Sequence, residues 1–126
     1  MRSREKGRFV DECIFCRIAR GEVPVRIIWE DAHAIAFDDN APQAPVHTLI
    51  VPRTHYVNLN DDIPAAVLVS IFGAVSKVAR VKGIAESGYR VIVNNGPDAS
   101  QTVQHLHVHV LGGRAMGHGM LTFVDE

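Results

Sequence analysis

The stretch "QHLHVHVLGG", residues 104–113, has a histidine at every second position from 105 to 109 and an aliphatic residue after each one. Successive side chains of a β-strand point to opposite faces, so His105, His107 and His109 are expected on one face of a strand. Neighbouring histidines on that face are about 6.5 Å apart at their α-carbons, close enough to act on one small ligand. The opposite face would carry three aliphatic residues: Leu106, Val108 and Val110. The stretch therefore predicts a strand with an apolar face against a core and an imidazole face toward a polar site.

Three explanations of the imidazole face stay open on the residues alone. The histidines are satisfied by backbone groups and water, or they bind a metal ion, or one of them attacks a substrate while its neighbours orient it and move protons. With a reference pKa of about 6.5, an imidazole is largely neutral at pH 7 and attacks phosphorus without first losing a proton. Three water-exposed imidazoles on one face of a strand need a reason, so a metal site or a catalytic site is favoured over histidines that bond only backbone groups and water.

The composition of the whole chain limits the domain count and the partners. With 126 residues, 47% apolar and 21% charged residues, the chain has the composition of one globular domain. Its formal net charge of -1 gives no electrostatic reason to bind a nucleic-acid polymer or a membrane surface. We see no apolar run of membrane-spanning length, no signal peptide in the charged start, and only two cysteines, so a cytoplasmic protein is expected.

Apolar periodicity predicts the order helix, strand, strand, strand, helix, strand, strand. The short helix and the strands are expected at 12–20, 25–31, 34–39, 46–53, 88–96 and 103–113. The long helix is expected from Ile63 to about Lys82, with Asp61 or Asp62 as its N-cap. Its buried stripe would hold Ile63, Val67, Ile71, Val75 and Val78, widened by Leu68, Phe72 and Ala79. This order predicts an α+β fold with a mainly antiparallel sheet and the long helix on one face.

The histidine stretch resembles the His-x-His-x-His signature, x being apolar, of the histidine triad (HIT) superfamily. Four other segments resemble its Hint branch, the histidine triad nucleotide-binding proteins: "CIFCRIARGEVPVRIIWED", "AFDDNAPQAPVHTLIVPRTH", "GYRVIVNNG" and "HVLGGR". The resemblance implies a HIT domain at 12–114 between a flexible N-terminal tail, 1–11, and a C-terminal tail, 115–126. It also implies a HIT-like fold: a five-stranded, mainly antiparallel sheet with a long helix and a short N-terminal helix. Two such sheets would join in a homodimer.

The activity that this resemblance implies is hydrolysis of purine nucleoside phosphoramidates, such as AMP-lysine or adenosine phosphoramidate. The P–N bond would be cleaved through a covalent nucleotidyl-histidine intermediate, without a cofactor, and AMP or GMP would be bound. Two alternatives stay open. One is a Fhit-like hydrolase of dinucleoside polyphosphates, and the other is a nucleotide-binding regulatory protein with weak catalysis.

The same resemblance implies a role for each matching residue. His107 would be the nucleophile, the carbonyl of His105 would hold its second nitrogen, and His109 would contact the phosphate and assist proton transfer. Asp39 would take both ribose hydroxyls. The purine would lie against Phe37, Leu49 and Ile28, and the phosphate would lie beside three neutral donors: Asn94, Gln101 and Thr102.

Two features depart from the Hint pattern. Thr102 stands where Hint proteins commonly carry serine, and "QTV" before the triad is also common in the Fhit-like branch. A hydroxyl is retained, so phosphoramidase chemistry survives while the leaving-group preference stays open. The C-terminal tail does not match the tryptophan-containing Hint terminus, and nothing is inferred for it.

The C-x-x-C pair predicts a second site. Many bacterial HIT proteins bind a structural zinc with such a pair and two distant histidines, and the resemblance implies Cys13, Cys16, His47 and His105 as the ligands. The alternatives are two free thiols on a helix, and a role for His47 in a hydrogen-bond relay behind the triad. His33 and His55 are expected as surface or loop residues.

Overall fold

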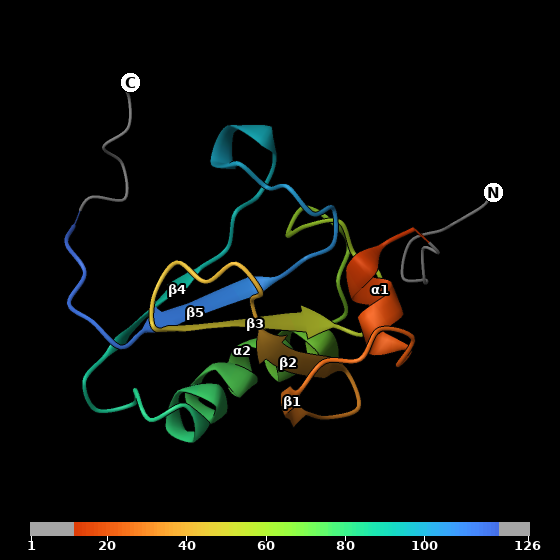
Figure 1. Cartoon of the computed structure of the whole chain (residues 1–126). Helices are drawn as coiled ribbons and strands as arrows, with labels where there is room; N and C mark the ends of the chain where they lie inside the picture. Colours follow the sequence, from red (N-terminus) through yellow and green to blue (C-terminus); the bar gives the residue numbers. More distant parts are fainter. Residues whose placement is uncertain (1–11, 119–126) are drawn as a thin grey trace.

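The computed structural model describes residues 12–118, and these form a five-stranded antiparallel sheet with two helices (Figure 1). In chain order the elements are α1 (Ile14–Ala19), β1 (Ile27–Glu30), β2 (Ala34–Asp38), β3 (Val46–Pro52), α2 (Ala65–Val81), β4 (Tyr89–Ile92), the 3-10 turn η1 (Pro97–Ala99) and β5 (Val108–Gly112). The strand order is β1-β2-β3-β5-β4, and every neighbouring pair is antiparallel. The expected α+β class, with a long helix and a short N-terminal helix, is confirmed.

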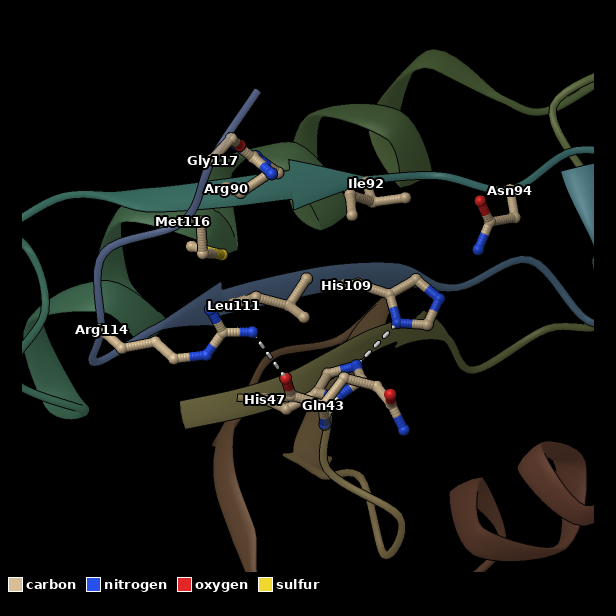
Figure 2. Close-up of a pocket in the computed structure, with 10 residues that line it drawn as sticks. All are labelled: Gln43, His47, Arg90, Ile92, Asn94, His109, Leu111, Arg114, Met116 and Gly117. Carbon is tan, nitrogen blue, oxygen red and sulfur yellow. Dashed lines mark hydrogen bonds between the residues drawn. The ribbon is translucent and has the colours of Figure 1, made fainter. Parts of the chain in front are cut away.

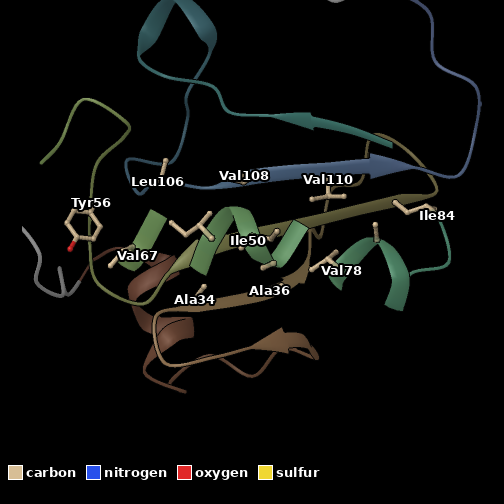
Figure 3. Close-up of a cluster of buried hydrophobic side chains, with 13 residues drawn as sticks. Ala34, Ala36, Ile50, Tyr56, Val67, Val78, Ile84, Leu106, Val108 and Val110 are labelled. Carbon is tan, nitrogen blue, oxygen red and sulfur yellow. The ribbon is translucent and has the colours of Figure 1, made fainter. Parts of the chain in front are cut away.

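The main core lies between α2 and one face of the sheet (Figure 3). Ala34 and Ala36 of β2 face α2, while Ile35 and Phe37, at the alternate positions, face the other way. Burying one large aliphatic side chain contributes about 1.5–3 kcal/mol, so the fully buried residues of this core are its main stabilising element. They include Ile50, Ile71, Val78, Leu106, Val108 and Val110.

The other face of the sheet is covered in part by α1. Phe15 and Ile18 of α1 pack against the sheet residues Phe37 and Leu49. The imidazoles of the histidine stretch lie on this face, since Phe15 contacts two of their rings, whereas the intervening aliphatic residues belong to the main core. The predicted alternation of the stretch is therefore confirmed, and the polar face looks toward α1.

Three details of the sequence prediction are wrong. β5 begins at Val108, so His105 and His107 precede the strand, in an extended segment where the Leu106 amide donates to the Tyr56 carbonyl at 2.6 Å. The α2 N-cap is Pro64, without a side-chain cap, because the Asp61 carboxylate accepts from the Val57 amide instead. Phe72 is 43% exposed and does not widen the buried stripe of α2.

The sheet has two edge strands. β1 is one edge, and β4 is the other. Beyond β5, the chain returns along β4, where the Arg90 guanidinium donates to the Gly117 carbonyl at 2.7 Å. Neither α1 nor α2 has the length and apolar character of a helix that crosses a membrane. The N-terminal tail, and the C-terminal tail from residue 119, lie outside the described residues.

Candidate active site

The candidate active site is built on one row of side chains that crosses four strands. The strand register pairs Phe37 of β2 with Leu49 of β3, Leu49 with His109 of β5, and His109 with Ile92 of β4. Residues directly opposite each other in antiparallel strands share a face, so these side chains form one continuous line. His107 is the residue directly before the start of β5, and its side chain lies on the same face as this row. The row makes an apolar floor that is interrupted by a single imidazole.

A main-chain carbonyl, that of His105, holds the His107 ring in one tautomer. Its Nδ1 donates to the carbonyl of His105 at 2.7 Å, and the side chain is buried, with 7% of its surface exposed. In a neutral imidazole one nitrogen carries the proton and the other carries a lone pair, so the lone pair of His107 lies on Nε2. Nε2 makes no hydrogen bond with any residue between 12 and 118. The ring is therefore oriented as a nucleophile.

A chain of hydrogen bonds also sets the tautomer of His109. The Gln43 amide donates to His47 Nδ1 at 3.0 Å, so His47 carries its proton on Nε2. That Nε2–H donates to His109 Nδ1 at 2.8 Å and lies 3.5 Å from an Asp39 carboxylate oxygen. The proton of neutral His109 is consequently on Nε2. This nitrogen is buried and has no partner among the described residues, so its N–H can donate to a ligand.

Burial keeps the two imidazoles neutral. Desolvation lowers the pKa of His107, and the hydrogen bond to the His105 carbonyl opposes this only in part. Desolvation, with the neighbouring His107 and His47, lowers the pKa of His109 to about 4. The folded protein therefore disfavours a charge on either ring near neutral pH. The His107–His109 pair, with ring centroids 5.0 Å apart, is available as a nucleophile and an N–H donor at once.

The direction of these pKa shifts predicts the pH dependence of any activity at this site. An imidazole with a lowered pKa stays neutral below its ordinary titration range, because only a higher proton concentration charges it. We expect kcat/KM to stay nearly constant from about pH 8 to 6.5 and to fall only at lower pH, where the rings take up protons, measured in overlapping buffers of constant ionic strength. A midpoint at 6.5 or above would contradict the burial argument.

A cavity of about 870 Å3 opens beside the row, between the sheet and α1. Four of the expected ligand-binding residues line it: Phe37, Asp39, Leu49 and Thr102. His107 and His109 form its polar end, and apolar side chains that include Ile14, Ile18 and Val25 form its other wall. Asp39 accepts from the Ala41 amide at 2.9 Å, which fixes the carboxylate and leaves further lone pairs for a ligand. We call this space the nucleoside cavity, after the ligand that the resemblance of the sequence predicts.

Two of the expected residues, Ile28 and Gln101, do not have the roles that the resemblance implied. Ile28 packs against the main core on the α2 side and does not line the nucleoside cavity. The buried side chain of Gln101 bonds four groups at loop junctions, accepting from Gly96 N and Asn58 Nδ2 and donating to the carbonyls of Val57 and Val103. That amide has nothing left for a phosphate, so it is a structural group. Asn94 lines a second cavity together with His109, so its expected place beside the phosphate stays a prediction.

The two cysteines form a separate donor cluster with two histidines. Ligand atoms of Cys13, Cys16, His55 and His105 all lie within 4.8 Å of one another. The Cys13 and Cys16 sulfurs are 3.3 and 3.5 Å from His105 Nδ1, and the Cys16 sulfur is 3.3 Å from His55 Nδ1. Hydrogen bonding with Cys16, and then with the two imidazoles, holds the pKa of the Cys13 thiol well below its usual range although burial opposes it.

This cluster fits a tetrahedral zinc ion. Zn–S bonds of about 2.3 Å and Zn–N bonds of about 2.0 Å at tetrahedral angles place sulfur and nitrogen about 3.5 Å apart. The observed S···N separations, between 3.3 and 3.5 Å, are close to that value. His105 Nε2 donates to the Pro52 carbonyl at 2.9 Å, which leaves the lone pair on Nδ1, toward the sulfurs. A backbone carbonyl behind a histidine is the usual support of a metal ligand.

The prediction that His47 belongs to the cysteine cluster is wrong, and the second histidine of the cluster is His55. β3 and β5 are antiparallel, with His47 opposite Leu111, six residues beyond His105. At about 3.3 Å per residue, that separation is about 20 Å, so His47 cannot reach the cysteines. His55 follows the other end of β3 and therefore lies beside the segment that precedes β5. His55 lies in the loop between β3 and α2, as expected, but its place in the cysteine cluster was not expected.

Two further contributors to the site were not expected from the sequence. The Gln43 amide sets the histidine tautomers, but a backbone N–H carries no signature of residue type. Ser100 lines the nucleoside cavity with a left-handed backbone, φ 61°, that no pattern in the sequence announced. His55, in contrast, had a usable signal, since an antiparallel pairing of 46–52 with 103–113 brings the end of one next to the start of the other.

The fold and the site are those of a histidine triad protein, and comparison with known proteins gives the family. Residues 20–116 match the HIT domain family. An uncharacterized 13.2 kDa HIT-like protein of Azospirillum brasilense is 47% identical over 82% of this chain and 88% of its own length. The purine nucleoside phosphoramidase of Escherichia coli is 41% identical over 85% of this chain and 92% of its own. The chain therefore belongs to the HIT domain family.

A solved structure agrees with this assignment. The HIT family hydrolase of Clostridium thermocellum superposes with a TM-score of 0.83 at 46% identity, covering 89% of this chain and 99% of that one. The resemblance of the histidine stretch to the HIT superfamily is thereby confirmed.

Proposed function

We propose that this protein hydrolyses purine nucleoside phosphoramidates to a nucleoside monophosphate and an amine. One observation carries the proposal: His107 presents a free Nε2 lone pair while His109, beside it, has a buried Nε2–H without a partner. Leaving a buried donor unpaired costs about 1–3 kcal/mol, and a phosphate oxygen or a leaving nitrogen would satisfy it. The name of the Escherichia coli relative supports the same class of substrate.

In the proposed mechanism, His107 Nε2 attacks phosphorus and forms a P–N bond as the bond to the leaving nitrogen breaks. The electron pair of the broken bond stays on that nitrogen, which takes the proton from His109 Nε2. Loss of this proton leaves a negative charge on the His109 ring, which the hydrogen bond from His47 Nε2 to His109 Nδ1 would stabilise until the proton returns. The His105 carbonyl accepts from the developing imidazolium at Nδ1.

The second half of the reaction restores the site. Water attacks the nucleotidyl group on His107 and gives a proton to His109 Nε2, while the P–N bond breaks with its electrons returning to His107. The products are a nucleoside monophosphate and the two neutral imidazoles. Attack and departure thus use one nucleophile and one proton carrier, without a cofactor.

The nucleoside half of the substrate would occupy the nucleoside cavity. Its apolar floor, Phe37 and Leu49, suits a flat purine such as that of AMP or GMP, and Phe15 stands edge-on to Phe37 at 5.7 Å between ring centroids. The Asp39 carboxylate would accept from the ribose hydroxyls, and the Thr102 hydroxyl would donate to the phosphate. A volume of about 870 Å3 accommodates a nucleotide.

A substrate panel tests the proposed function against its two alternatives. We expect kcat/KM for AMP-lysine and for a fluorogenic adenosine phosphoramidate to exceed that for diadenosine triphosphate by about 100-fold, because the amine needs the proton that His109 provides. Faster cleavage of diadenosine triphosphate would favour the Fhit-like alternative. Calorimetric binding of AMP without turnover of any member would favour a regulatory protein.

We also propose that Cys13, Cys16, His55 and His105 hold a structural zinc ion. Two thiolates and two imidazoles close a tetrahedral coordination shell, so the ion would have no open position for a substrate or a water. Its contribution would be stability, since it would link α1, the end of β3 and the start of the histidine stretch. No step of the proposed hydrolysis passes through it.

Exposed apolar residues support a further proposal, that the protein is a homodimer. β4 is an edge of the sheet and exposes Val91 by 40%, and α2 exposes Val69 by 72% and Phe72 by 43%. Such surfaces favour association with a partner. We expect a dimer by analytical ultracentrifugation at micromolar concentration and a monomer for Phe72→Glu. Leu59→Glu, at a similarly exposed residue before α2, should stay dimeric, and a dimeric Phe72→Glu would contradict the proposal.

A further inference from the structure

A second cavity, of about 470 Å3, lies on the other side of His109 from most of the nucleoside cavity (Figure 2). His109, His47 and Gln43 line both spaces, so the proposed proton donor stands at their boundary. The proposed hydrolysis leaves this space without an assigned occupant. The residues that line only the second cavity are Arg90, Ile92, Asn94, Leu111, Arg114, Met116 and Gly117.

The floor of the second cavity consists of two neighbouring rows of the sheet. The first row is the end of the active-site row, from His109 to Ile92. The second row runs from His47 through Leu111 to Arg90. Rows on one face are two residues apart along a strand, which is about 6.6 Å. Arg90 therefore lies roughly one such step from the row that carries His109.

The two ends of the cavity differ in chemistry. Figure 2 shows His109 and Asn94 at one end and the guanidinium groups of Arg90 and Arg114 at the other, with apolar side chains between them. Arg90 donates to the Gly117 carbonyl, and Arg114 donates to the carbonyls of Gln43 and Ala115. A guanidinium has five N–H donors, so both retain donors for a ligand.

Neither arginine has a carboxylate partner within the part of the chain that the structure describes. Arg53, in contrast, pairs with Glu30 at 2.6 Å, and Lys82 pairs with Asp38 at 2.8 Å. Among residues 12–118, therefore, no carboxylate balances the positive charge that Arg90 and Arg114 give to this end of the cavity. An anion held there gains charge-assisted hydrogen bonds that a neutral group does not.

We propose that the second cavity binds the leaving group, and that it selects leaving amines that carry an anion a few bonds from the scissile nitrogen. This inference rests on the proposed function. The nitrogen lies at His109, where it takes its proton, a short aliphatic spacer crosses Ile92 and Leu111, and the anion meets Arg90 and Arg114. A carboxylate and a phosphate share the required chemistry.

Four adenosine 5'-phosphoramidates of similar length test this selectivity. The leaving amines differ in the charge at the end away from the scissile nitrogen. Propylamine has no charge there, 3-aminopropanoate ends in a carboxylate, phosphoethanolamine ends in a phosphate, and 1,3-diaminopropane ends in a cation. For the wild-type protein we expect kcat/KM to be about tenfold higher for at least one anionic conjugate than for the propylamine conjugate, and lowest for the diamine conjugate. The better of the two anions tells whether the site takes a carboxylate or a phosphate.

Charge-removing and charge-keeping variants separate the guanidinium charge from packing. In the double variant Arg90→Gln, Arg114→Gln, the ratio of anionic to neutral kcat/KM should fall to about one, whereas Arg90→Lys, Arg114→Lys should keep most of it. Arg53→Gln removes an arginine outside both cavities, so it should keep the full ratio. Thermal unfolding of each variant checks that the domain is folded.

Each outcome decides between the two levels of the proposal. A wild-type protein that cleaves the propylamine conjugate but shows no anionic preference overturns the leaving-group site and leaves the proposed function intact. An anionic preference that survives in the glutamine double variant also overturns it. If no conjugate is cleaved, the proposed function fails, and the leaving-group site fails with it.

Discussion

His107→Asn should abolish the hydrolysis of a fluorogenic adenosine phosphoramidate, lowering kcat by about 10⁴-fold or more. Asparagine has no aromatic lone pair to attack phosphorus, and no other free nitrogen is held at the same point by the His105 carbonyl. Folding should persist, since the side chain contributes one hydrogen bond and two ring contacts, with Phe15 and His109. Single-turnover rates and a thermal unfolding curve measure the two effects separately.

A matched control and a trapping experiment make this result specific. His33→Asn changes an exposed histidine in the turn before β2 and should keep wild-type turnover. Acid-quenched wild-type protein should carry a nucleotidyl adduct on the peptide with residue 107, and His107→Asn should carry none. Turnover near the wild-type rate in His107→Asn would contradict the covalent mechanism.

Removal of the proposed zinc ion should lower the free energy of unfolding more than any other change predicted here for this protein. The ion would link α1, the loop after β3 and the histidine stretch, and its binding free energy is gained only in the folded state. A loss of a few kcal/mol in a domain of this size lowers Tm by roughly 10–15 °C. We expect this shift by calorimetry after treatment with a strong chelator, and its reversal when zinc is added back.

Two histidine variants test which residues hold the ion. His55→Ala should lower the zinc content of protein purified without added metal to well under half an equivalent per chain. His47→Ala should retain about one equivalent, because its ring bonds to His109 rather than to the cysteine cluster. The reverse pattern would restore the ligand set that the sequence alone suggested. No zinc in the wild-type protein would rule out a metal at this cluster.

The alternation of residues 104–113 predicted the two faces of the histidine stretch because side-chain direction depends only on local backbone geometry. His109 lies in β5, and His105 and His107 lie just before it, yet all three follow the alternation. The same reasoning located β1, β2 and the long helix α2, since each depends on a periodicity visible within one segment.

Partners across the sheet were harder to predict, since they depend on register rather than on residue type. His47 and His55 are equally plausible ligands in the sequence, and the antiparallel pairing of β3 with β5 separates them by placing one at each end. Gln101 was misassigned for a related reason. Its amide is surrounded by backbone groups from 57, 96 and 103 that come together only in the folded chain.

His105 takes part in two tasks through different atoms. Its ring belongs to the cysteine cluster, whereas its carbonyl oxygen, a main-chain atom, orients His107. Every amino acid supplies such an oxygen, so the chemistry at phosphorus places no demand on the side chain at position 105. Selection on that side chain would come from the buried contacts of its ring, with the cysteine cluster, the Pro52 carbonyl and Phe15, rather than from the reaction at phosphorus.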